Sequence, residues 1–106
     1  MAHKIREVYI VHHSHTDVGY TDLQEQVIYN QANNIRRAVE LIADGLEKGT
    51  NQKGLKWNCE TWYCVEQFLK VATKEEKKTF FDLVKKNSIG LSANYLNFND
   101  LADCEY

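Results

Sequence analysis

The chain has 106 residues, of which 43% are hydrophobic and 26% are charged, a balance typical of a folded domain rather than a disordered or fibrous segment. A net charge of −2 gives no overall field that would favour nucleic acid or an anionic membrane as a partner. No signal-peptide core is evident, nor an apolar run near the roughly 18 residues that a membrane span needs. With an odd number of cysteines, 3, the sequence predicts a cytoplasmic protein with free thiols.

A short apolar run near the start predicts a first β-strand. Residues 8–11 are β-branched and aromatic without alternation, which is typical of a strand buried on both faces of a parallel sheet. A long helix is expected from near Asp22, because Thr21 and Gln24 have the spacing of a capping box, and Gly49 is expected to end it. Its apolar stripe has helical spacing and comprises Ile28, Ala32, Ile35, Val39, Ile42 and Leu46.

The second half of the chain continues this alternation of strands and helices. Residues 55–59 and 89–93 predict a second and a third strand, and Thr73 with Glu76 forms another capping box at a helix start. The two helical stripes between these strands, expected to face the core, comprise Trp62, Val65, Leu69 and Ala72, then Phe80, Phe81 and Val84. The predicted order is therefore β-α-β-α-α-β. Strands separated by helices pair in parallel, so the predicted fold class is α/β with a parallel sheet.

Metal-binding side chains gather where the first predicted strand ends, the edge at which parallel sheets hold their functional sites. Segment 13–20 reads His-Ser-His-Thr-Asp-Val-Gly-Tyr. Imidazole and carboxylate together suit zinc, and alternate residues of an extended chain point the same way. Either His15 with Asp17 or His13 with His15 could therefore hold one ion. The structural alternative, with His13 in the core and Asp17 capping a turn, is less favoured because burying so many polar groups requires many partners.

Segment 13–20 resembles the N-terminal signature of glycoside hydrolase family 38, the α-mannosidases. Residues 60–62, 65–69 and 94–97 resemble bacterial members in the same order, so the resemblance covers nearly the whole chain. It implies that residues 1–106 are a single segment, the N-terminal portion of an incomplete catalytic domain and the first part of a seven-stranded β/α barrel. The full-length protein would be a zinc-dependent retaining α-mannosidase acting on α-mannosides.

The resemblance also implies roles for individual residues. His15 and Asp17 would be two ligands of one zinc ion, which holds sugar hydroxyls and helps the ring distort. Tyr20 stands where many members have tryptophan and would bind substrate by packing against the sugar. His13 would support a ligand from behind or act as an alternative ligand.

Several residues that the family's chemistry needs are missing from this chain. Family members have a nucleophile in a Trp-x-x-Asp-Pro-like segment, a separate acid/base carboxylate, and two more zinc ligands, an aspartate and a histidine. This chain has no proline, and no histidine follows His15. We therefore expect no catalytic residue within it, no turnover by the chain alone and weak zinc binding. An incomplete sheet also leaves exposed edges, which predicts self-association.

Two other functions remain open. Another barrel metallohydrolase, of the amidohydrolase or phosphoesterase type, would use both His13 and His15 and commonly hold two ions. A binding or scaffold domain would perform no chemistry. Cys59 and Cys64 match no usual redox or zinc spacing and are expected to be buried or idle thiols. Polar residues near the other predicted strand ends could line a sugar pocket, although capping and turn roles are more common, and they are Glu60, Asn94, Asn97, Asn99, Asp100 and Asp103.

Overall fold

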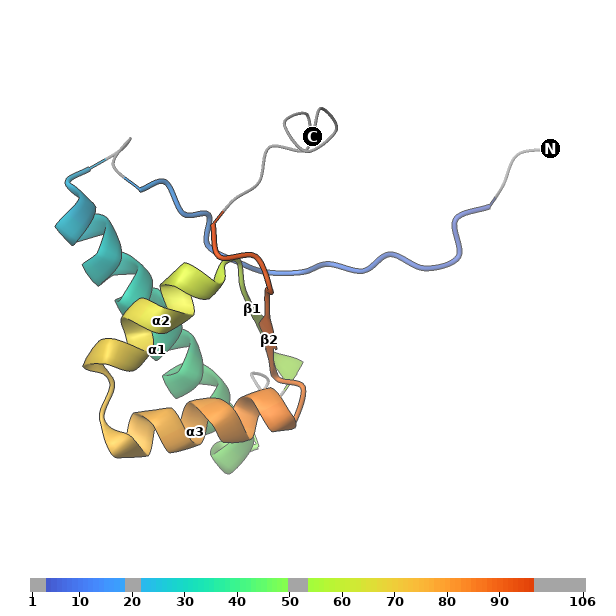
Figure 1. Cartoon of the computed structure of the whole chain (residues 1–106). Helices are drawn as coiled ribbons and strands as arrows, with labels where there is room; N and C mark the ends of the chain where they lie inside the picture. Colours follow the sequence, from blue (N-terminus) through green and yellow to red (C-terminus); the bar gives the residue numbers. More distant parts are fainter. Residues whose placement is uncertain (1–3, 19–21, 50–53, 97–106) are drawn as a thin grey trace.

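A computed structural model describes residues 4–18, 22–49 and 54–96 of the chain. Its elements, in chain order, are α1 (Gln24–Lys48), β1 (Trp57–Cys59), α2 (Trp62–Val71), α3 (Lys74–Lys85) and β2 (Ile89–Leu91). The three helices pack together on one side, and the two short strands lie side by side next to them (Figure 1).

The described part of the chain is mainly helical, so the predicted fold class is wrong. Its sheet consists of β1 and β2 alone, and the β-α-β-α-α-β beginning of a seven-stranded barrel is not formed by these residues. Residues 8–11, the predicted first strand, are extended but between 65% and 84% exposed. This segment runs past the strands towards the start of α1 without joining the sheet (Figure 1).

In the described part of the chain, residues 8–11 pair with neither strand of the sheet. The amide of Asn58 donates a hydrogen bond to the carbonyl of His12 at 2.9 Å, which ties the N-terminal segment to β1. The apolar run precedes this contact and is largely exposed. β-propensity without a partner does not make a strand.

Helix α1 follows its predicted stripe but begins later than expected. It starts at Gln24, after Leu23, and no side chain caps this start. Thr21, the other half of the expected capping box, lies outside the described residues. The predicted end is confirmed, because Gly49 has a left-handed φ of 62° and its amide donates to the carbonyl of Gly45. The stripe residues that are fully buried are Ala32, Ile35, Val39 and Ile42.

The core lies between α1 and the pair α2 and α3. Val65, Phe68 and Phe80 are 0% exposed, and the rings of Phe68 and Phe80 have centroids 5.3 Å apart. Trp62 is 36% and Phe81 41% exposed, so the prediction that these two face the core is wrong. The buried face of α3 carries Phe80 and Leu83, and Phe81, about 100° around the helix from Phe80, lies outside it.

The capping box at the start of α3 is confirmed. The hydroxyl of Thr73 accepts a hydrogen bond from the amide of Glu76 at 3.2 Å, and the Glu76 carboxylate accepts one from the amide of Thr73 at 2.7 Å. These two bonds satisfy amides that the first turn of a helix would otherwise leave unpaired.

The second and third predicted strands are present in shortened form. β1 and β2 pair in parallel, with Trp57 opposite Ile89, Asn58 opposite Gly90 and Cys59 opposite Leu91. The helical connection through α2 and α3 permits this pairing, because parallel strands need a crossover, whereas a tight hairpin joins antiparallel strands.

Of the helices in the described residues, none combines the length and apolarity needed to cross a bilayer.

Candidate functional site

The residues predicted to bind metal lie together at the carboxyl end of β1. His13, His15 and Asp17 belong to the extended N-terminal segment, which passes β1 before it reaches α1. Glu60, directly after β1, contacts His13 and His15, and His15 contacts Asp17. Tyr20, the predicted sugar platform, lies outside the described residues. So do several of the polar residues proposed to line a pocket: Asn97, Asn99, Asp100 and Asp103.

Buried polar contacts hold this segment between α1 and α2. Thr16 is 5% exposed, and its hydroxyl lies 3.0 Å from the sulfur of Cys64 in the first turn of α2. On the other side, the side-chain amide of Gln31 in α1 donates to the carbonyl of His15 at 3.0 Å. Cys64 is itself buried, as expected, and so is Cys59. The side chains predicted to bind metal therefore project from a backbone fixed on both sides.

Glu60 is the centre of the cluster. Its Oε1 lies 2.8 Å from Nδ1 of His15 and 3.5 Å from Nδ1 of His13. Its Oε2 accepts a hydrogen bond from the backbone amide of Thr16 at 2.7 Å. The Glu60 side chain is 16% exposed, whereas that of His13 is 42% exposed, so His13 is not the core histidine of the structural alternative.

The imidazole of His15 lies between two carboxylates. Nε2 is 3.0 Å from Oδ1 of Asp17, on the opposite side of the ring from the Glu60 contact. The hydrogen bond and charge of Glu60, together with the charge of Asp17, raise the pKa of His15 above its ordinary value. Burial pushes the pKa of Glu60 up, but the contacts from His15, Thr16 and His13 outweigh it and lower that pKa. The cluster thus favours a positive charge between its carboxylates.

Such a charge can be a proton or a metal ion. A neutral imidazole that donates from Nδ1 to Glu60 presents its Nε2 lone pair to the Asp17 carboxylate, and two acceptors 3.0 Å apart repel each other unless a cation lies between them. Zinc binds nitrogen and carboxylate oxygen at about 2.0–2.2 Å, so these two atoms, which lie at hydrogen-bond distance, would have to move apart to ligate one ion. The donor types therefore suit zinc, while their separation is that of a hydrogen bond.

Two ligands do not complete a zinc site. Within residues 4–18, 22–49 and 54–96, no three His, Cys, Asp or Glu side chains are arranged to hold one ion. Structural zinc sites are almost always four-coordinate, and catalytic sites usually have three protein ligands. A zinc ion bound by His15 and Asp17 therefore needs further donors.

A polar hollow of about 350 Å³ opens beside the His15–Asp17 pair. Its lining residues come from residues 15–22 and the first turns of α1, and they are His15, Asp17, Asp22, Val27, Asn30 and Gln31. Carboxylate and amide groups are suited to hydrogen bonds with a hydroxyl-rich ligand. The geometry thus places space and polar side chains next to His15 and Asp17.

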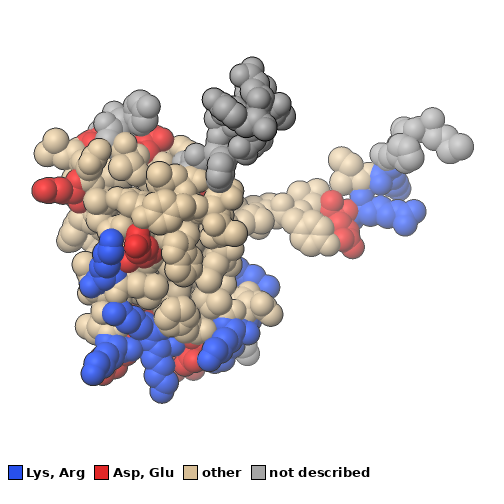
Figure 2. All heavy atoms as spheres, in the orientation of Figure 1, with Lys and Arg blue, Asp and Glu red and all other residues tan. Residues whose placement is uncertain are grey.

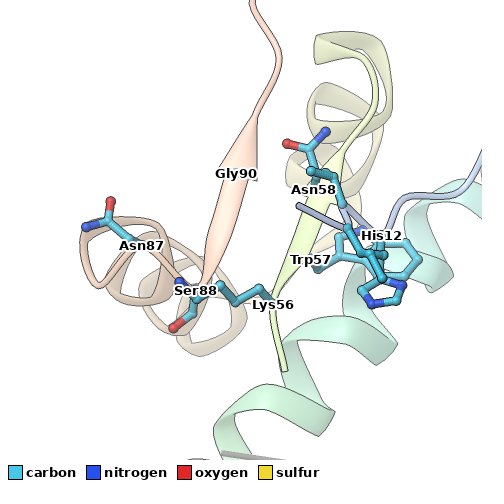
Figure 3. Close-up of a pocket in the computed structure, with 9 residues that line it drawn as sticks. His12, Lys56, Trp57, Asn58, Asn87, Ser88 and Gly90 are labelled. Atoms are coloured by element: carbon cyan, nitrogen blue, oxygen red, sulfur yellow. The ribbon is translucent and has the colours of Figure 1, made fainter. Parts of the chain in front are cut away.

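A second hollow, of about 220 Å³, lies elsewhere on the molecule. It is bounded by β1, which carries Asn58, by β2, which carries Gly90, and by His12 on the N-terminal segment (Figure 3). Its lining includes Lys56 and Trp57 but no carboxylate. It therefore lacks the imidazole–carboxylate pairing that marks the cluster around Glu60.

Surface charge agrees with a cation at the cluster. Lysine and arginine side chains gather at the end of the body where α3 lies, while acidic side chains mark the end at which α1 begins (Figure 2). The segment with His13, His15 and Asp17 leads towards that acidic end, where α1 has Glu25 in its first turn. A field of this sign favours a cation over an anionic ligand.

Sequence reasoning missed the part that Glu60 plays. The sequence indicated Glu60 as a residue that could line a sugar pocket, but its carboxylate contacts His15 and the amide of Thr16. The available signal was its position immediately after the second predicted strand, at the same edge as the histidines.

Comparisons of the chain with protein-family models, curated proteins and solved structures gave no match. Functional inference therefore depends on the residues and their geometry.

Proposed function

We propose that this chain supplies two zinc ligands, His15 and Asp17, to a retaining glycoside hydrolase of the α-mannosidase type. The observation that carries the proposal is the position of the His15 ring, with Nε2 3.0 Å from Asp17 and Nδ1 2.8 Å from Glu60. This arrangement lies in the segment that resembles the family 38 signature. The nucleophile, the acid/base carboxylate and the other zinc ligands would come from outside these 106 residues. We also propose a cytoplasmic location, with which the two buried free thiols accord.

Each residue of the cluster has a defined task in this proposal. His15 binds the ion through Nε2 while Nδ1 donates to Glu60, and Asp17 supplies a negative oxygen from the other side. Zinc, when bound, polarises and orients hydroxyl groups of the sugar. Asp22 and Asn30 face the adjacent hollow and are placed to hydrogen bond to those hydroxyls, and Tyr20 would pack against the sugar ring.

The test replaces Asp17 in the chain expressed with whatever sequence follows Tyr106 in its reading frame. Asp17→Ala should lower zinc content and the hydrolysis of an aryl α-mannoside together, with an unchanged circular dichroism spectrum. The matched control is Asp44→Ala. It removes a carboxylate of α1 that lies away from the cluster and pairs with Lys48 at 2.6 Å, so it should change neither zinc content nor hydrolysis. Unchanged zinc content in Asp17→Ala would refute the ligand assignment.

The same protein separates this function from a two-metal hydrolase. One zinc ion per chain, retained in His13→Ala, agrees with the proposal, because His13 lies 3.5 Å from Glu60 as a supporting side chain. Two ions per chain that are both lost in His13→Ala would contradict it.

A further inference from the structure

We propose that the N-terminal arm, residues 4–11, pairs antiparallel with the same arm of a second copy, so that two chains form a symmetric dimer. The inference goes beyond the proposed function, because the arm ends before His13, the first residue of the cluster around Glu60. It also differs from the self-association expected from the sequence, in which open edges of the sheet would pair.

The arm exposes a run of large apolar side chains. It extends away from the body of the molecule (Figure 1, Figure 2). Single apolar residues are common on protein surfaces, but a contiguous set of them marks an interaction site. Those of the arm are each at least 65% exposed, and they are Ile5, Val8, Tyr9, Ile10 and Val11.

The backbone of the arm is also available for pairing. Within residues 4–18, 22–49 and 54–96, the amides and carbonyls of residues 4–11 make no hydrogen bond. The hydroxyl of Tyr9 donates to the carboxylate of Glu7 at 2.6 Å, but this bond joins two side chains of the same arm. An extended segment of this kind can pair with a strand of another chain, because its main-chain hydrogen bonds provide affinity.

The charges of the arm favour a second copy as the partner. Arg6 and Glu7 are adjacent and exposed. When two arms run antiparallel, the register that places Arg6 opposite Glu7 of the second copy forms this pair twice, because the dimer is symmetric. The same register places Ile5 opposite Val8, also twice. Opposite charges and apolar side chains that face each other across two strands both stabilise the pairing.

Other partners and registers fit the arm less well. A shift by one residue places either Glu7 opposite Glu7 or Arg6 opposite Arg6, and like charges directly opposite each other destabilise a strand pair. A partner strand with charges of one sign would leave Arg6 or Glu7 facing a like charge. Because self-pairing uses both arms reciprocally, it closes at two copies.

The experiment measures the dissociation constant of the 106-residue chain by sedimentation equilibrium. The wild type should approach twice the 12.4 kDa of one chain as its concentration rises. Arg6→Glu and Glu7→Arg each place like charges opposite each other, so each should raise the dissociation constant about tenfold. The two variants mixed, and the double variant Arg6→Glu/Glu7→Arg alone, restore both opposite-charge pairs and should associate as the wild type does.

The matched control is Arg37→Glu, which makes the same change of charge on α1, at an exposed side chain paired with Glu40 at 3.1 Å. It should leave the dissociation constant unchanged. Because the arm lies outside the core, the circular dichroism spectra of its variants should match that of the wild type. A wild type that stays monomeric at about 1 mM would overturn the proposal. So would assemblies that grow beyond two copies, or a dimer that both single reversals leave unaffected, as one formed through the sheet edges would be.

Discussion

Arg36 of α1 donates a hydrogen bond from Nε to Oε1 of Glu76 in α3 at 2.7 Å. The other oxygen of the same carboxylate, Oε2, accepts from the amide of Thr73 and so completes the capping box of α3. One side chain therefore both starts α3 and ties it to α1. Since both contacts favour the ionised carboxylate, the packing of these helices depends on the charge of Glu76.

The first prediction concerns acid stability. Hydrogen bonds from Thr73 and Arg36 lower the pKa of Glu76 from its ordinary 4.5. A group whose pKa is depressed by folding stabilises the fold above its unfolded pKa, and this contribution is lost as the pH falls through the folded pKa. Glu76→Gln should therefore be less stable than the wild type at neutral pH, and the difference should shrink as the pH falls below 4.5.

Urea unfolding at a series of pH values measures this difference. Glu75→Gln removes a neighbouring acid in the same first turn and serves as the control, with a smaller effect at neutral pH. A Glu76→Gln difference that stays constant from neutral pH into the acid range would contradict the role assigned to the carboxylate.

The second prediction uses two adjacent phenylalanines of α3. Phe80 is 0% exposed and packs against Phe68, whereas Phe81 is 41% exposed. Removing a fully buried phenylalanine leaves a cavity, so Phe80→Ala should lower the free energy of unfolding by about 3–5 kcal/mol. Phe81→Ala should cost clearly less, and similar losses in urea unfolding would show that the core is not centred on Phe80.

Local signals allowed the helices to be predicted from the sequence. Thr73 with Glu76 starts a helix and the left-handed Gly49 ends one, each through hydrogen bonds to backbone groups within one turn. Such local effects can be predicted from the sequence. Residues 8–11 have an equally clear β pattern, but a strand requires a partner, and these residues lie outside the sheet and are largely exposed. Strand formation depends on such distant contacts and could not be predicted from the run itself.

The candidate site, too, could be predicted from the sequence only in part. The alternation of His13, His15 and Asp17 predicted a cluster, and the structure brings these side chains to the end of β1. The contact between His15 and Glu60 joins residues that are 45 positions apart, so only the packing of β1 against the N-terminal segment reveals it. Sequence reasoning could place Glu60 at the right edge but could not identify its partner.

The third prediction concerns the close approach of β1 and β2. Gly90 lies opposite Asn58, and a Cβ atom on Gly90 would come within 2.6 Å of the Asn58 side-chain oxygen (Figure 3). Gly90→Ala should therefore force the Asn58 side chain to move, at a cost of about 1–3 kcal/mol. The same change in an Asn58→Ala background should cost less, because the obstructing oxygen is gone.

Gly54→Ala is the matched control for this test. A Cβ on Gly54 would meet nothing within 4 Å, so the substitution should not lower the free energy of unfolding through a clash. Thermal unfolding of the wild type, the three single variants and the double variant measures each cost. Equal losses for Gly90→Ala with and without Asn58 would exclude the predicted contact.

The last prediction concerns the thiol of Cys59. Burial, together with the neighbouring Cys64, raises the pKa of Cys59 to about 12, and its side chain lies in the core at 2% exposure. The thiolate is the reactive species in alkylation, so Cys59 should be almost inert to iodoacetamide in the folded chain and react readily in urea. Peptide mapping by mass spectrometry separates its labelling from that of the other cysteines. Labelling of Cys59 in the folded chain at the rate seen in urea would mean that the strand carrying it opens freely, and with it the support that holds Glu60 against His15.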